Sequence, residues 1–134
     1  MRDINAGKFE KVYLLEGEES YFIDKIAEAL SKRVMPEEDK AFNHFTYYGS
    51  DADVGEIVNT AKSSPLGTEH LLIEVREAQL MERLEDLAYY LQRPLESTIL
   101  VICYKNGTVD KRKRLATLAQ KNGVLFEAKK LYDN

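Results

Sequence analysis

The residues best placed to do chemistry lie where an apolar run, VYLLEG, meets a helical pattern. In many nucleotide-binding proteins such a junction is a P-loop, G-x-x-x-x-G-K-[ST], whose amides and lysine hold the phosphates and whose hydroxyl holds magnesium. The stretch here, GEESYFID, has one glycine and no lysine, and Glu18 and Glu19 would repel a triphosphate. The dinucleotide pattern G-x-G-x-x-G is also absent. We therefore expect Gly17 to form a tight strand-to-helix turn, with acidic residues favourably placed at a helix N-terminus.

Other catalytic arrangements have no better support in the sequence. There is no G-x-S-x-G elbow. His44 and His70 begin separate predicted strands and lack the H-E-x-x-H spacing of a zinc site. Cys103, the only cysteine, lies in the most apolar run and is typical of a small core residue. The sequence therefore predicts no catalytic residue, no metal site and no cofactor.

Four cations in succession form the clearest charged feature. They are Lys111, Arg112, Lys113 and Arg114, within the stretch DKRKRL. At a predicted helix start they oppose the preference of the helix dipole for negative charge. A solvated surface explains them most simply, and contact with an acid-rich protein or nucleic acid is the alternative.

A second feature is apolar and lies in the stretch AKSSPLGTEHLL. A predicted helix ends at Pro65, and Leu66 follows in what should be an exposed loop. A single exposed leucine is ordinary on a protein surface. From composition alone, a partner-binding role for Leu66 is the less common explanation.

Composition limits the classes of protein to which this chain can belong. Its 134 residues suit one ordinary domain, and 44% hydrophobic with 31% charged residues is typical of a soluble globular protein. The net charge of −4 argues against general attraction to nucleic acid. A single cysteine indicates no disulfide framework and favours a reducing compartment. The N-terminus lacks the apolar core of a signal peptide, and no run has membrane-spanning length. We expect a cytoplasmic protein without a membrane partner.

Short apolar runs and helical stretches alternate along the chain. The predicted strands are Lys11–Leu15, His44–Tyr48, His70–Val75, Thr98–Tyr104 and Val124–Ala128. The predicted helices have apolar stripes at Phe22–Val34, Val54–Ala61, Leu80–Leu91 and Leu115–Ala119. The predicted N-caps are Ser20 for the first helix, Asp53 for the second and Asp110 for the fourth. The first helix is expected to stop at Pro36, the third at Pro94 and the fourth at Gly123. Strict alternation predicts a three-layer α/β domain over residues 1–134, with a parallel five-stranded sheet and helices on both faces.

Five segments, taken in order, carry a resemblance to a known family. They are KVYLLEGEESYFIDKI, FNHFTYYGSD, SSPLGTEHLLIEVREAQLM, TILVICYKNGTVDKRKRL and GVLFEAKKL. Together they resemble the N-terminal domain of the delta subunit of the bacterial DNA polymerase III clamp loader, over nearly the whole chain. The resemblance implies an AAA+-like domain, related to P-loop NTPases, that lacks a functional phosphate loop and does not bind ATP. Gly17 and Glu19 match the turn of the family.

The resemblance also implies a partner, the ring-shaped sliding clamp (the beta subunit), one of whose interfaces this domain helps to open in DNA replication. In the family the contact follows the second helix, where a proline or serine precedes two large hydrophobic residues. The matching segment here is Ser64–Gly67: Pro65 and Leu66 fit the first two positions, and Gly67 departs from the third. A pocket-filling anchor contributes about 2 kcal/mol. Either Leu66 anchors alone, or the register is displaced, or the contact is weaker.

The family's full-length chain is longer than this one. It has a second small domain and a C-terminal helical domain that joins the loader ring, so we expect this chain to be a fragment. Contact with other clamp-loader subunits would then be lost with those domains, and DNA would be contacted indirectly, as part of the complex. The chain would be a component of the DNA polymerase III holoenzyme with no catalytic site of its own. The Lys111–Arg114 run could contact a loader subunit, DNA or only water.

Two other classes of function are weaker alternatives. A nucleotide-dependent enzyme on a similar sheet is disfavoured by the missing G-K-[ST] and the acidic turn at Gly17. A receiver-like regulatory domain needs a phosphoacceptor aspartate at a strand end and a lysine opposite. Lys105 could supply the lysine, but the central strand HLLIEV has no aspartate at its carboxyl end.

Overall fold

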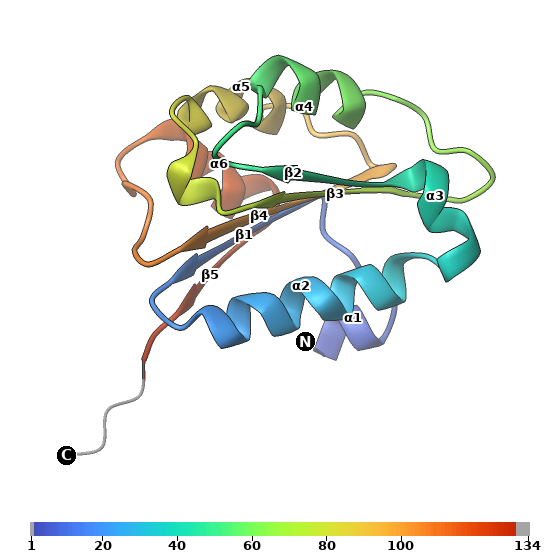
Figure 1. Ribbon diagram of the computed structural model, residues 1–134, viewed down its shortest axis with the longest axis horizontal. Helices are drawn as coiled ribbons and strands as arrows, with labels where there is room; N and C mark the ends of the chain where they lie inside the picture. The colour runs from blue at the N-terminus through green and yellow to red at the C-terminus, as the bar shows by residue number, and fades with distance from the viewer. Residues whose placement is uncertain (1, 131–134) are drawn as a thin grey trace.

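A single sheet of five parallel strands forms the centre of the computed structural model, which describes residues 2–130 (Figure 1). The strands are β1 Val12–Gly17, β2 His44–Tyr48, β3 Leu71–Arg76, β4 Thr98–Lys105 and β5 Val124–Ala128. Their order across the sheet is β2-β3-β4-β1-β5. The predicted strands are thus confirmed, with shifts of one or two residues at the ends of β1, β3 and β4.

Helices cover both faces of this sheet (Figure 1). One face carries α4 Val54–Ala61, α5 Ala88–Leu91 and α6 Arg114–Asn122, and the other carries α1 Arg2–Asn5 and α2 Ser20–Val34. A short 3₁₀ turn, η1 Glu37–Asp39, leads into α3 Lys40–Asn43 beside the start of β2. The predicted three-layer α/β architecture is confirmed.

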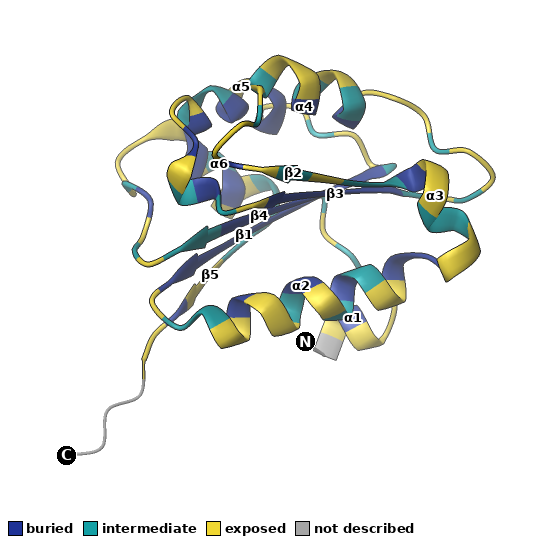
Figure 2. Cartoon of the chain, in the orientation of Figure 1, coloured by how far each residue is buried: buried dark blue, intermediate teal, exposed yellow. Residues whose placement is uncertain are grey.

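Burial along each strand follows its place in the sheet (Figure 2). All six residues of β1 and the first six of β4 are buried, because both strands are covered on two faces. The edge strands β2 and β5 are mostly half-buried or exposed. Ile73 and Leu100 belong to the core under α4, α5 and α6, and Ile23 and Val101 belong to the core under α1 and α2. Each core fixes its helices on the sheet.

Side-chain caps set the starts of two helices. Asp53 accepts a hydrogen bond from Glu56 N at 3.0 Å, so the predicted cap of α4 is confirmed. The predicted cap of α2 is wrong by one residue. Glu19 caps this helix by accepting a hydrogen bond from Tyr21 N at 3.2 Å, and Ser20 is the first helical residue.

The predicted third helix is wrong as a continuous element. The segment folds as three short pieces, η2 Ala78–Leu80, η3 Leu84–Leu87 and α5 Ala88–Leu91. Met81 between the first two is extended, with φ −86° and ψ 116°. Its side chain is buried, whereas Leu80 is 55% exposed. Short turns return an apolar residue to the core every three or four positions, so their spacing imitates that of a helix.

The connections reverse direction between β1 and β4. From β1 the chain runs through α2 to β2 at the far edge of the sheet, whereas from β4 it runs through α6 to β5 on the other side of β1. Ligands of open α/β sheets usually bind at the carboxyl ends of strands at such a switch point. The carboxyl ends of the strands hold the Gly17 turn. The Ser64–Gly67 loop lies at the opposite side, where the strands begin, since it precedes β3.

Candidate functional site

The loop between α4 and β3 presents Leu66 to solvent. Its side chain is 64% exposed, and Ser64 and Gly67 beside it are exposed as well. Pro65 is half-buried. Gly67 has φ +74° and no atom within 4 Å of the place where a Cβ would lie. The loop therefore offers one large apolar side chain, at the residue to which the sequence points.

A buried amide side chain fixes the backbone of this loop. Asn43, at the end of α3, is 1% exposed. Its Oδ1 accepts from Leu66 N at 2.7 Å, and its Nδ2 donates to Leu66 O at 2.9 Å. The same Nδ2 also donates to Asp39 O at 2.9 Å. The exposed leucine thus stands on a backbone tied to α3, 23 residues earlier in the chain. Figure 1 shows this loop running beside α3.

At the carboxyl ends of the strands, the β1–α2 junction is closed by the protein's own backbone. Gly17 N donates to Gly107 O at 2.8 Å, and Gly17 O accepts from Asn106 N at 3.0 Å. Glu19 N donates to Ala128 O at 3.1 Å. Gly17 has φ +126°, and a Cβ at this position would lie 2.2 Å from Ala128 O. Two amides that would face a phosphate in a P-loop are therefore engaged with β5 and the loop after β4.

A buried carboxylate holds the loop after β4 in place. Glu16 is 0% exposed, and its Oε1 accepts from Val109 N at 2.9 Å. Lys111 Nζ lies 2.5 Å from Glu16 Oε2 and also donates to Val109 O at 2.9 Å. One member of the basic run therefore neutralises a buried charge at the switch point.

The rest of the basic run lies on the surface before α6. Asp110 accepts from the guanidinium and the backbone N of Arg112, and these bonds lower the pKa of Asp110 to about 2. Asp110 does not cap α6 as predicted. The helix begins at Arg114, after an N-cap at Lys113, because Asp110 turns back onto Arg112 instead. Lys113 and Arg114 are the exposed members of the run that the described ion pairs do not include.

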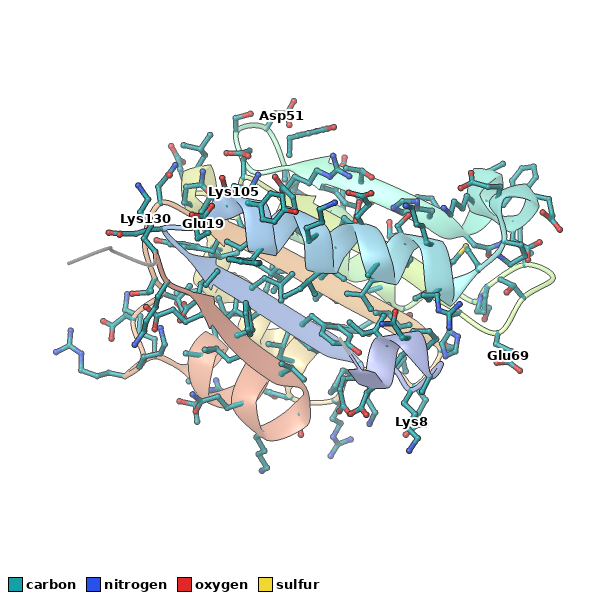
Figure 3. The ribbon with its side chains drawn as sticks, turned by 90° about the horizontal axis from the view of Figure 1, so that it is seen from below. Lys8, Glu19, Asp51, Glu69, Lys105 and Lys130 are labelled. Carbon is teal, nitrogen blue, oxygen red and sulfur yellow. The ribbon has the colours of Figure 1, made fainter. Side chains whose placement is uncertain are left out.

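Ion pairs also occupy the carboxyl ends of β3 and β4. Lys105 Nζ lies 2.8 Å from Asp24 on α2; burial alone would lower the pKa of Lys105, but the hydrogen bond and the charge of Asp24, together with the charge of Glu77, raise that pKa. Figure 3 shows Lys105 and Glu19 near one end of α2. Glu74 is 1% exposed, and its Oε2 contacts His44 and Arg76 at 3.2 and 3.1 Å. Burial alone would raise the pKa of Glu74, but these partners lower it.

Cys103 is a core residue, as the sequence predicts. It is 3% exposed, and burial raises the pKa of its thiol to about 12. Since the thiolate is the reactive form, we expect a disulfide reagent such as DTNB at pH 8 to modify the folded protein on the order of 100-fold more slowly than the urea-unfolded protein. Equal rates would contradict the burial of this thiol.

Sequence reasoning missed two residues at the loop and one apolar hollow. The alternating aromatics of FNHFTYY indicate strand, which hides the fact that Phe42 and Asn43 end a short helix. The hollow, of ≈ 910 Å³, lies between α1, α2 and β5, with Tyr21 and Phe126 on its wall. The exposed aromatic residues are its only sequence signal. Residues 2–130 contain neither a helix long and apolar enough to span a membrane nor a cluster of His, Cys, Asp and Glu that could hold a metal ion.

The comparison with protein families decides the assignment. The profile of the family "DNA polymerase III, delta subunit" matches residues 13–129, which include all five strands except Val12 of β1, as well as the Ser64–Gly67 loop and the Lys111–Arg114 run. The chain belongs to the DNA polymerase III delta subunit family. A curated member, the DNA polymerase III subunit delta of Bacillus subtilis, is 24% identical over 97% of this chain. Family membership places the chain among proteins of DNA replication.

Solved structures agree with this fold. The clamp loader delta protein of Bacillus subtilis superposes with a TM-score of 0.85, at 23% identity over 97% of this chain and 41% of its own length. A DNA polymerase III gamma subunit-related protein of Thermotoga maritima gives 0.64, at 16% identity over 95% of this chain and 43% of its own. The present chain spans about two-fifths of the length of these delta subunit relatives, 40% of the curated one.

Proposed function

We propose that this delta subunit chain binds the ring-shaped sliding clamp through the Ser64–Gly67 loop and favours opening of the ring. The observation that carries the proposal is Leu66, 64% exposed on a backbone that Asn43 holds at two points. An apolar side chain on a fixed backbone has the character of an interface anchor, because it can fill a pocket without first being ordered.

Opening the clamp requires no covalent chemistry. A protein that binds the open ring more tightly than the closed ring shifts the ring toward the open form by the difference between the two affinities. The proposed role of the loop is to supply part of that difference. Residues around Leu66, such as the exposed Ser64, would form the polar rim of the contact.

We also propose that the domain acts without binding ATP. Two observations support this part of the proposal: the sequence lacks G-K-[ST], and the amides of Gly17 and Glu19 already donate to protein carbonyls. The ion pair between the buried Glu16 and the partly exposed Lys111 lies at the same end of the sheet. A triphosphate would have to displace these bonds and approach the carboxylates of the turn.

The remaining partners are proposed from the resemblance to the family. We propose that the protein acts together with the other clamp-loader subunits, and that it meets DNA through the assembled complex in the cytoplasm. Lys113 and Arg114 are exposed and outside the described ion pairs, and they are the members of the Lys111–Arg114 run that we propose to contact a subunit or DNA. No catalytic residue is proposed in this chain.

Replacing Leu66 by alanine should weaken binding to the sliding clamp of the same organism about tenfold or more, since it removes the apolar anchor. Leu80→Ala is the matched control: Leu80 is also exposed, at 55%, but follows the carboxyl end of β3 at the opposite edge of the sheet. Calorimetry or surface plasmon resonance measures both affinities.

Clamp binding by the wild-type chain tests the proposed function itself. If it is folded and does not bind the clamp, the proposal is wrong. If it binds and Leu66→Ala binds equally well, the function stands and the anchor lies elsewhere. A rise in melting temperature on addition of ATP and magnesium would instead favour a nucleotide-dependent protein.

A further inference from the structure

A second large apolar side chain is exposed next to the residue that holds the Leu66 loop. Phe42 lies on α3 and is 67% exposed. Its neighbour in sequence, Asn43, is buried and hydrogen-bonded to both backbone polar groups of Leu66. One asparagine therefore connects the two segments that carry the exposed phenylalanine and the exposed leucine.

The loop itself cannot supply a second anchor at the next position. Gly67 has no side chain, and its φ of +74° is a conformation that residues with a Cβ rarely adopt. The space around its Cα is open. An interface with two apolar anchors must therefore take the second one from another segment, and α3 is the segment bonded to this loop.

We propose that Phe42 is the second apolar anchor for the sliding clamp, and that Asn43 is a positioning residue that sets Phe42 and Leu66 in one contact surface. This inference rests on the proposed function. It goes beyond it by adding a contact residue from a segment 24 positions before Leu66, counted from Phe42. Phe42 on α3 then supplies the apolar side chain that Gly67 lacks.

The charges beside this surface indicate the partner's chemistry. The turn η1, directly before α3, carries three acidic residues in succession. Glu37 pairs with Lys40 at 2.7 Å, which leaves Glu38 and Asp39 outside the described ion pairs. The surface is thus an apolar pair with negative charge at its side. The complementary surface on the clamp is an apolar pocket bordered by cations or hydrogen-bond donors.

The test is a double-substitution cycle measured as clamp affinity. Phe42→Ala and Leu66→Ala should each weaken binding about fivefold to thirtyfold, and the double variant should lose less than the product of the two factors, because both residues fill one surface. Tyr89→Ala is the control: Tyr89 is 77% exposed, on α5 rather than α3. This control should bind as the wild type does.

The role of Asn43 needs a readout beyond stability. In an Asn43→Ala background, at a temperature where the chain stays folded, the losses caused by Phe42→Ala and Leu66→Ala should become independent. Retained coupling in that background would overturn the positioning role.

The outcomes separate this inference from the proposed function. Wild-type binding that Phe42→Ala leaves unchanged overturns the second anchor alone. A folded wild type without clamp affinity overturns both. Phe42→Ala variants that unfold are replaced by Phe42→Gln, which keeps an extended side chain on the exposed helix but removes the aromatic ring.

Discussion

We expect the replacement of Gly17 by alanine to lower the free energy of unfolding by about 3 kcal/mol or more. Two causes act together at this residue. Its φ of +126° is strained for a residue with a Cβ, and the added Cβ would lie 2.2 Å from Ala128 O and 2.8 Å from Ala128 N. Since both contacts are with backbone of β5, relief requires the strand itself to move. Urea unfolding followed by circular dichroism measures the loss.

Gly7 is the matched control for this substitution. Its φ of +80° is also positive, but no atom lies within 4 Å of its Cβ position. Gly7→Ala should therefore show only the conformational cost, about 1 kcal/mol. The additional loss of unfolding free energy in Gly17→Ala measures the cost of the close approach of β5 to the turn. Equal losses in the two variants would show that the β1–α2 junction is not closed as described.

Replacing Glu16 by alanine is expected to cost about 2–3 kcal/mol. The substitution leaves the buried Val109 N–H without its acceptor and frees Lys111, so the loop after β4 loses its attachment to β1. Amide hydrogen exchange at Val109 should rise in the same variant, while exchange in the central strands follows only the global loss of stability. Urea unfolding and exchange measured by NMR check the two parts.

Two further variants separate the causes of that loss. Glu16→Gln keeps an oxygen for Val109 N but removes the charge opposite Lys111, so it should fall between alanine and the wild type. Glu18→Ala removes an exposed acid from the same turn and should change stability by less than about 0.5 kcal/mol. Unchanged exchange at Val109 in Glu16→Ala would contradict the proposed attachment.

The sheet could be predicted because its signal is local. Runs such as TILVICY are apolar at nearly every position, which happens when a strand is covered on both faces. The aromatic, alternating residues of FNHFTYY likewise favour an edge strand, and β2 lies at the edge of the sheet. The Leu80–Leu91 segment could not be predicted in the same way, since periodic leucines occur in a helix and in successive short turns alike.

The candidate surface could be predicted only in part. Exposure of Leu66 follows from a proline stop before the next strand, which is local. The Asn43–Leu66 bonds join residues 23 positions apart, and the Glu16–Val109 bond joins residues 93 apart. No spacing rule reaches such distances in one sequence. For the same reason Glu16 resembles one more exposed acid of the turn, whereas it is buried in the structure.

The Asn43 bridge has a consequence for the energetics of binding. Ordering a loop residue costs about 1–2 kcal/mol of backbone conformational entropy, and a flexible loop meets that cost when its partner arrives. Here two hydrogen bonds with the buried amide side chain of Asn43 fix the backbone of Leu66 while the chain folds, and a third ties that amide to Asp39. A partner therefore meets a surface whose entropy is already lost. Weakening the bridge should reduce affinity even though Asn43 itself, 1% exposed, is out of a partner's reach.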